Sequence, residues 1–219
     1  MNLSIFDVIG PIMIGPSSSH TAGAVKLART ASLIAAKPFT HVDFALHGSF
    51  AKTGVGHGTK LALLAGVLGI TKDDERIKKS REIAAAQGIS YTFSEVELDD
   101  VHENTAMITF THTDSTKSTI IGCSIGGGRI LITSIDGMAV ELAAEQPTLG
   151  IQQRDEQGVI SQVSQVLADN NINIAIMRVS RKAKRDVATN VIETDERIPA
   201  AGAEQLAALD VVHSVRVIQ

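Results

Sequence analysis

The sequence contains a single cysteine, Cys123, and no tryptophan. One cysteine excludes an intrachain disulfide, which fits a reducing compartment such as the cytoplasm. It also excludes a four-cysteine zinc or iron–sulfur site within this chain. A cofactor of that kind would therefore have to be supplied by another chain.

Aromatic side chains make up only 3% of the residues, and the 20 basic against 24 acidic residues give a net charge of −4. Nucleic acids are bound through a basic surplus or stacking aromatics, so we expect no nucleic-acid partner. No run reaches the roughly 18 apolar residues that a membrane-spanning helix needs. The first ten residues lack the pattern of a secretory signal, so neither a membrane partner nor export is expected.

The 219 residues, 44% hydrophobic and 20% charged, are typical of a globular chain of one or two domains. The composition changes near Pro147, because 15 of the 18 glycines and six of the seven histidines precede it. We therefore expect an α+β chain with a mixed α/β domain over residues 1–147 and a second domain over 148–219.

The second domain has a regular pattern. Alternating residues predict strands over 148–154, 172–180, 187–193 and 211–218. Helical spacing begins at Val159, and Pro199 opens a helix that extends to Leu209. The basic run Arg181–Arg185 is interpreted as an exposed hairpin turn. The order βαββαβ is the split βαβ, or ferredoxin-like, arrangement.

The first domain mixes both element types. Helices are predicted over 21–36 and 58–68. The stretch 71–87 is predicted to contain a charged helix with acids before bases, as the helix dipole favours. Strands are predicted over 42–47, 91–98, 106–113, 118–124 and 129–135. His102 and His112 fall on turns or polar strand faces and are interpreted as surface residues.

The first candidate site is Gly15-Pro16-Ser17-Ser18-Ser19-His20-Thr21, ahead of a predicted helix. Serine caps helix starts, and the free N–H groups there also suit a carboxylate or phosphate. His20 is suited to proton transfer near neutral pH. The alternative is a helix cap beside a surface histidine.

The second candidate is HGSFAKTGVGHGTK, residues 47–60, between a strand and a helix. Its glycines, among them Gly56, allow a ligand to approach the backbone, and His57 stands between two of them. Thr59 breaks the GxGxxG pattern and the P-loop pattern is also absent, so a nucleotide site is disfavoured. His57 is either a site residue or an ordinary loop histidine.

The third candidate is the run Gly126-Gly127-Gly128 in CSIGGGR, which is either a hairpin turn or a strap over a ligand. Cys123, beside it, has no cationic neighbour and is interpreted as a buried small hydrophobe. The fourth candidate is the turn Asp155-Glu156-Gln157-Gly158 with Asn173, a small-molecule site at the edge of a dimer sheet or merely a capped turn.

These motifs resemble a known family. MNLSIFDVIGPIMIGPSSSHTAGA, HGSFAKTGVGHGTK and SIGGGRI are similar to the beta chain of iron–sulfur L-serine dehydratases. QQRDEQGVISQVSQVLADNNINI resembles the start of an ACT domain, a small-molecule regulatory module. In serine-binding ACT domains a His and an Asn stand where this chain has Gln153 and Asp155, whereas Asn173 matches.

The resemblance implies conversion of L-serine to pyruvate and ammonia, with a [4Fe–4S] cluster held by cysteines of an alpha subunit and not by this chain. It implies that Ser17, Ser18, Ser19 and Thr21, with Gly56, bind the substrate. His20 and His57 are then the candidates for proton transfer, and either one can be the base.

Two further expectations concern assembly and function class. Ferredoxin-like regulatory domains pair by extending their sheets, and the last predicted strand, in VVHSVRVIQ (residues 211–219), offers an edge that needs cover. We therefore expect a homodimer through the ACT domain or the N-terminal domain. The alternative to a lyase subunit is a non-catalytic regulatory protein that senses an amino acid.

Overall fold

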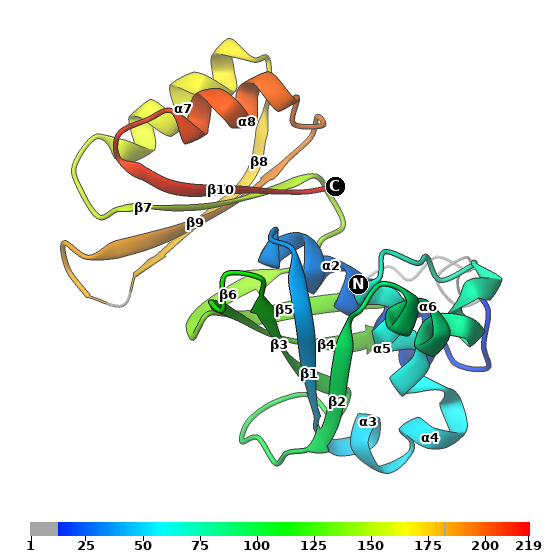
Figure 1. Ribbon diagram of the computed structural model, residues 1–219. Helices are drawn as coiled ribbons and strands as arrows, with labels where there is room; N and C mark the ends of the chain where they lie inside the picture. The colour runs from blue at the N-terminus through cyan, green and yellow to red at the C-terminus, as the bar shows by residue number, and fades with distance from the viewer. Residues whose placement is uncertain (1–12, 182) are drawn as a thin grey trace. The chain divides into compact units, whose positions relative to one another are not determined.

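A computed structural model of the chain describes residues 13–181 and 183–219. Residues 1–12, which begin the segment MNLSIFDVIGPIMIGPSSSHTAGA, and Lys182 of the predicted basic turn lie outside the described residues. The chain divides into two compact units, Met1–Gly137 and Met138–Gln219 (Figure 1). The division falls somewhat before Pro147, where the composition changes.

The first unit contains helices and a sheet. Its helical elements are η1 (Ser18–Gly23), α2 (Ala24–Ala35), α3 (Gly48–Lys52), α4 (Gly54–His57), α5 (Thr59–Val67), η2 (Glu75–Lys79) and α6 (Ser80–Ala86). Its strands are β1 (Phe39–Leu46), β2 (Ser90–Glu95), β3 (Thr105–His112), β4 (Lys117–Gly126) and β5 (Arg129–Ile135). They lie in the order β2-β1-β3-β4-β5, and β6 (Met138–Leu142) is next in the sheet.

Alternation of apolar residues determines which face of this sheet is buried. In β1, Val42, Phe44 and Leu46 are buried, as the pattern VDFALH predicts. Strand β1 is parallel to β2 and antiparallel to β3, and β3, β4 and β5 are antiparallel to one another. The C-terminal ends of the parallel pair β1 and β2 therefore lie at the same edge, where α3 begins directly after β1.

The helices α2 and α5 pack closely on each other and α2 packs on β4 and β5. A Cβ atom at Gly66 of α5 would lie 2.4 Å from the carbonyl oxygen of Val25, so only glycine allows this approach. The small residues of α2 and α5 thus bring the chain segments before each helix, which carry the first two motifs, close together.

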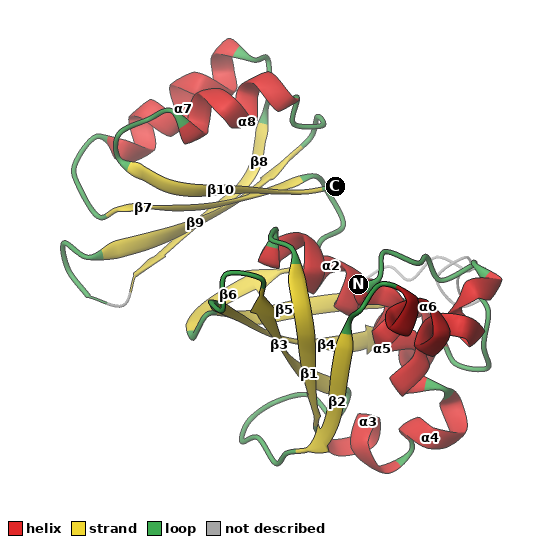
Figure 2. Cartoon of the chain, viewed as in Figure 1, coloured by secondary structure: helices red, strands yellow, loops and turns green. Residues whose placement is uncertain are grey.

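The second unit confirms the split βαβ order. Its elements are β7 (Thr148–Arg154), α7 (Val159–Asp169), β8 (Ile174–Arg181), β9 (Val187–Thr194), α8 (Ala200–Ala207) and β10 (Val212–Ile218). The strand order is β10-β7-β9-β8, and every neighbouring pair is antiparallel. Figure 2 shows α7 and α8 on one face of this sheet. Leu149, Ile151, Val163 and Ile192 are among the residues of the core between helices and sheet.

Several sequence expectations for the elements need correction. The single helix predicted within 71–87 is two elements, because the side chain of Asp74 caps a 3-10 helix at the Arg76 N–H and the regular helix begins only at Ser80. The short helices α3 and α4 and the strand β6 were not predicted. His112 is buried, contrary to the surface assignment, with its ring held by Ser118 and the carbonyl of Pro38.

Cys123 is buried, as predicted. Burial raises the pKa of its thiol, so the side chain stays a protonated thiol near neutral pH. It therefore acts as a small apolar residue of the core rather than as a nucleophile or a metal ligand.

Candidate active site

The serine-rich motif forms a π-helix, η1, rather than the first turn of an α-helix. Ser17 caps it with an extended backbone, and its Oγ accepts a hydrogen bond from the N–H of His20 at 3.1 Å. π-helices are rare and are frequent at functional sites. His20 and Thr21 of this π-helix are both buried, and α2 follows it directly at Ala24.

The imidazole of His20 is held on both sides by hydroxyl groups. Its Nδ1 lies 2.9 Å from Oγ1 of Thr59, and its Nε2 lies 3.2 Å from Oγ of Ser49. Thr53 Oγ1 donates its one proton to the carbonyl of Ser49 at 2.9 Å, so the Ser49 hydroxyl donates to Thr53 in return. Ser49 then accepts from His20, which assigns the proton to Nε2 and leaves Nδ1 to accept from Thr59.

His20 is 8% exposed and its ring meets Phe50 edge-on, with 5.2 Å between ring centroids. The ring of His57 lies 5.0 Å away, centroid to centroid. Burial, and secondarily the neighbouring His57, lowers the pKa of His20. His20 is therefore a neutral, fixed imidazole at pH 7.

The surroundings of His57 differ from those of His20, although the two rings are neighbours. It ends the four-residue helix α4, and its side chain is exposed. Within the described residues neither ring nitrogen of His57 has a hydrogen-bond partner, while its carbonyl accepts a long hydrogen bond of 3.4 Å from Thr21 Oγ1. The pair thus combines one anchored imidazole with one whose nitrogens are free for a ligand.

A cavity of about 420 Å³ opens beside His57. Its lining includes Gly15 and Pro16 of the first motif, Thr21 of η1 and His57 and Gly58 of the second motif. The two motifs therefore share one cavity of a size that suits a small amino acid.

Residues 4–134 match the family described as serine dehydratase beta chain, and residues 148–211 match the ACT domain. The chain belongs to the serine dehydratase beta-chain family. It is 42% identical over 194 residues to the L-serine dehydratase beta chain of Peptoniphilus asaccharolyticus, covering 88% of this chain and 87% of that one. It is 41% identical to a probable L-serine dehydratase beta chain of Bacillus subtilis, covering 89% and 88%.

A more distant relative has a different name. The chain is 27% identical to a D-3-phosphoglycerate dehydrogenase of Bacillus subtilis over 89% of its own length but only 37% of that protein. The matched part is therefore a minority of the length of that protein.

In this family member, the residues predicted for the first two motifs are brought together. Ser18, Ser19, His20 and Thr21 lie in η1, with Ser17 as its cap, and Gly56 precedes His57 in α4. The glycine run forms the turn between β4 and β5, with positive φ angles of 94°, 61° and 75° at Gly126, Gly127 and Gly128. Glycine is needed there for the turn itself. The run follows Ser124, which contacts η1 at Gly23.

The residues predicted for the ACT effector site are not brought together within one chain. Asp155 is bound by Arg181 Nη1 at 2.6 Å and by the N–H of Arg185 at 2.9 Å, at the C-terminal end of β8. Asn173 precedes the N-terminal end of β8, and its side chain donates to Asp195 at 2.6 Å. The length of the strand separates them.

Sequence reasoning missed the side chains that hold His20. Ser49 and Thr59 both lie in the second motif, but neither could be assigned to His20, which is 29 and 39 residues away. Ser124 was also missed. Its hydroxyl is buried without a hydrogen-bond partner among the described residues and lies against the backbone of η1.

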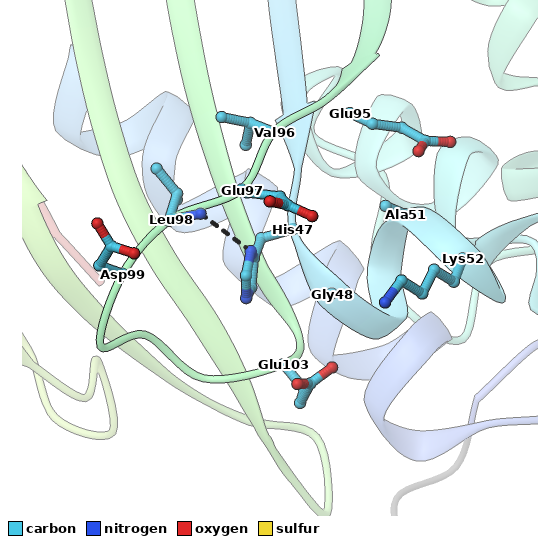
Figure 3. A pocket seen from close by; sticks show the side chains of 10 residues that line it. All are labelled: His47, Gly48, Ala51, Lys52, Glu95, Val96, Glu97, Leu98, Asp99 and Glu103. Atoms are coloured by element: carbon cyan, nitrogen blue, oxygen red, sulfur yellow. Dashed lines mark hydrogen bonds between the residues drawn. The ribbon is translucent and has the colours of Figure 1, made fainter.

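A second cavity, of about 320 Å³, is lined by α3, by His47 directly after β1, and by the end of β2 with the loop that connects it to β3. Figure 3 shows His47, Lys52 and four carboxylates around it, and the hydrogen bond of 3.2 Å from the N–H of Leu98 to His47 Nδ1. Four residues of the second motif, His47, Gly48, Ala51 and Lys52, line this cavity, but none of the residues predicted to bind the substrate or transfer a proton does.

The chain's own residues do not fit an iron–sulfur cluster. The single cysteine is buried, and residues 13–181 and 183–219 contain no group of three or more His, Cys, Asp or Glu side chains placed to bind a metal. Across the same residues, no helix is both long and apolar enough to span a bilayer.

The lowered pKa of His20 predicts how stability changes with pH. The unfolded chain takes up a proton near pH 6.5, whereas the folded chain resists it to a lower pH. The unfolding free energy should therefore fall as the pH decreases through 6.5 and level off below the folded pKa. His20→Gln should flatten this slope in urea unfolding between pH 7.5 and 5.5. His213→Gln, an exposed control, should keep it, and equal slopes in both variants would contradict the assignment.

Proposed function

We propose that this chain is the beta subunit of an L-serine ammonia-lyase that converts L-serine to pyruvate and ammonia together with a second, cluster-bearing subunit. The observation that carries the proposal is a pair of neighbouring histidines, of which His20 is neutral and anchored and His57 lines the cavity with free ring nitrogens. Membership of the serine dehydratase beta-chain family, with relatives named L-serine dehydratase, supports the substrate.

In this proposal His57 is the base. A free nitrogen of its ring takes the proton from the α-carbon of L-serine, and the electron pair forms the Cα–Cβ double bond. The β-hydroxyl leaves as water with the proton that the His57 imidazolium gives back, which restores the neutral ring. The aminoacrylate that remains tautomerises to an imine, which water hydrolyses to pyruvate and ammonia. A neutral imidazole suits the first step near pH 7.

His20 has a positioning role, because both of its nitrogens are already bound to hydroxyl groups. It packs beside His57 and holds η1 against α3 and α5. Ser18, Ser19 and Thr21, together with the O–H of Ser17 and the backbone near Gly56, are the proposed contacts for the substrate's carboxylate or amine. The glycine run Gly126–Gly128 is proposed only as a flexible loop that could cover a ligand, because it follows Ser124, which contacts η1.

The [4Fe–4S] cluster belongs to the partner alpha subunit in this proposal, since several thiolates hold such a cluster and this chain has one cysteine. The activity therefore requires the heteromer, and the isolated chain is expected to be nearly inactive. A reducing, cytoplasmic compartment suits a chain with one free thiol.

Anaerobic affinity purification of the chain from its own cells tests the proposal. The eluate is assayed for iron, sulfide and pyruvate formation from L-serine. A co-purifying cysteine-bearing chain with about four irons and serine-dependent pyruvate would support the lyase. An iron-free, inactive eluate that binds L-serine, from cells that contain the cluster-bearing chain, would instead support an amino-acid sensor.

We also propose that the ACT domain, residues 148–219, forms a homodimer through β8 and that its effector site is completed by the second copy. Strand β8 is an edge of its sheet and exposes Ile176 and Val179, at 39% and 50%. Antiparallel pairing of two copies of β8 would bring Asn173 of one copy to the Asp155–Gly158 turn of the other. A small amino acid is the proposed effector.

Charge on the pairing edge should prevent this dimer. Val179→Lys places a charge at β8 and is expected to give a monomer in sedimentation at concentrations where the wild-type chain is dimeric. His213→Lys, on the opposite edge strand β10, is the matched control and should leave the dimer intact. Dissociation by His213→Lys alone would move the interface to β10.

A further inference from the structure

The charge of the cavity beside His57 is set by a residue outside both motifs. Apart from His57, its only ionisable lining residue among the described residues is Lys78, which lies in η2, and no carboxylate lines it. The other lining residues from that side, Leu61 and Ile77, are apolar. The cavity is therefore complementary to a small anionic group.

Lys78 is carried on a backbone that is fixed to the first motif. The N–H of Ile14 donates a hydrogen bond of 2.8 Å to the carbonyl of Lys72. The segment before η2 is therefore held to the residues that directly precede Gly15. The side chain of Ile77 is buried, which fixes the rotation of η2. The position of the Lys78 backbone relative to the cavity is thus determined by packing.

The neighbouring cations of η2 are not equivalent to Lys78. The guanidinium of Arg76 is occupied by Asp74, with two hydrogen bonds of 2.8 and 2.6 Å. Lys79 does not line the cavity. Lys78 forms no ion pair with any residue in the described part of the chain, so its ammonium group is available to a ligand.

We propose that Lys78 is a specificity-determining residue that binds the α-carboxylate of the amino-acid substrate. This inference rests on the proposed function and names a substrate contact for the same site. A charge-assisted hydrogen bond from the ammonium group holds the carboxylate at the η2 side of the cavity. The α-carbon then lies between Lys78 and His57, and amino-acid amides or alcohols, which lack the anion, are poor substrates.

The test uses the heteromer, reconstituted anaerobically from the cluster-bearing subunit and each variant of this chain. Lys78→Met keeps most of the apolar stem and removes the charge, and it should raise KM for L-serine by about 10- to 100-fold. The kcat should change by less than about threefold, because carboxylate binding is the same before and during the reaction. Lys78→Arg should restore most of the affinity, and Lys79→Met, the matched control, should match the wild type.

Discrimination between L-serine and L-serinamide separates a substrate contact from a structural effect. The wild-type heteromer should prefer L-serine in kcat/KM, and Lys78→Met should lose that preference by lowering the value for L-serine alone. An equal loss for both substrates, or an unchanged KM for L-serine, would overturn the role of Lys78. A wild-type heteromer that forms no pyruvate would overturn the proposed function itself, and the inference would fall with it.

Discussion

His57→Ala should lower kcat of the heteromer for L-serine by about 10²- to 10⁴-fold, the range typical of losing a general base. KM should change little, because the exposed ring of His57 is proposed to act on the α-proton rather than to hold the substrate. The measurement is pyruvate formation under anaerobic conditions at saturating L-serine. L-serine deuterated at the α-carbon should react more slowly in the variant if proton removal limits its rate.

Two comparisons make the result specific to proton transfer. Added imidazole should restore part of the activity of His57→Ala, because removal of the side chain leaves space at an exposed position beside the cavity. His213→Ala removes an exposed histidine of β10 and should behave as the wild type. A His57→Ala enzyme with a normal kcat would eliminate His57 as the base.

The corresponding substitution of His20 should affect stability as well as activity, unlike the substitution of His57. His20 bridges Thr59 and Ser49, so its loss removes one buried and one partly buried hydrogen bond and loosens η1. His20→Ala should therefore lower stability as well as activity, and imidazole should not rescue it at a site that is 8% exposed. The two histidines differ because His20 is buried and hydrogen-bonded whereas His57 is exposed. The sequence alone left either of them as the possible base.

Local patterns predicted the elements that depend on strong periodicity. The alternating strands and the amphipathic helix α7 follow from residues that lie within one element. His112 shows that the same rule could have been applied further. It continues the series Ala106, Ile108, Phe110 on the inner face of β3, so alternation itself places it in the core.

The elements that were missed have weak or conflicting local signals. Helices α3 and α4 are only five and four residues long and lie among glycines, which usually interrupt helices. The π-helix η1 depends on contacts with β4, α2 and α5 rather than on its own sequence. The roles of Ser49, Thr59 and Ser124 likewise depend on which segments the fold brings together, and this information is absent from any one motif.

The packing of η1 predicts a large stability effect at Gly23. A Cβ atom there would lie 2.0 Å from Oγ and 2.8 Å from Cβ of Ser124, on a strand whose backbone is held by pairing with β3 and β5. Helix propensity alone would favour alanine by about 0.8–1 kcal/mol. Overpacking at this distance should prevail, so Gly23→Ala is expected to lower the unfolding free energy by about 1–3 kcal/mol. Urea unfolding of the isolated chain measures it.

The identity of the clashing group can be tested by a second substitution. Ser124→Gly removes the two atoms that would lie closer than 3 Å to the new methyl group, and the Ser124 hydroxyl has no hydrogen-bond partner among the described residues to lose. The double variant Gly23→Ala with Ser124→Gly should therefore be more stable than Gly23→Ala alone, although each single change is destabilising. Gly150→Ala is the control, because its added Cβ meets only Arg216 Cβ at 3.8 Å, an ordinary contact. Additive losses in the double variant would mean that η1 and β4 are not packed as tightly as these distances require.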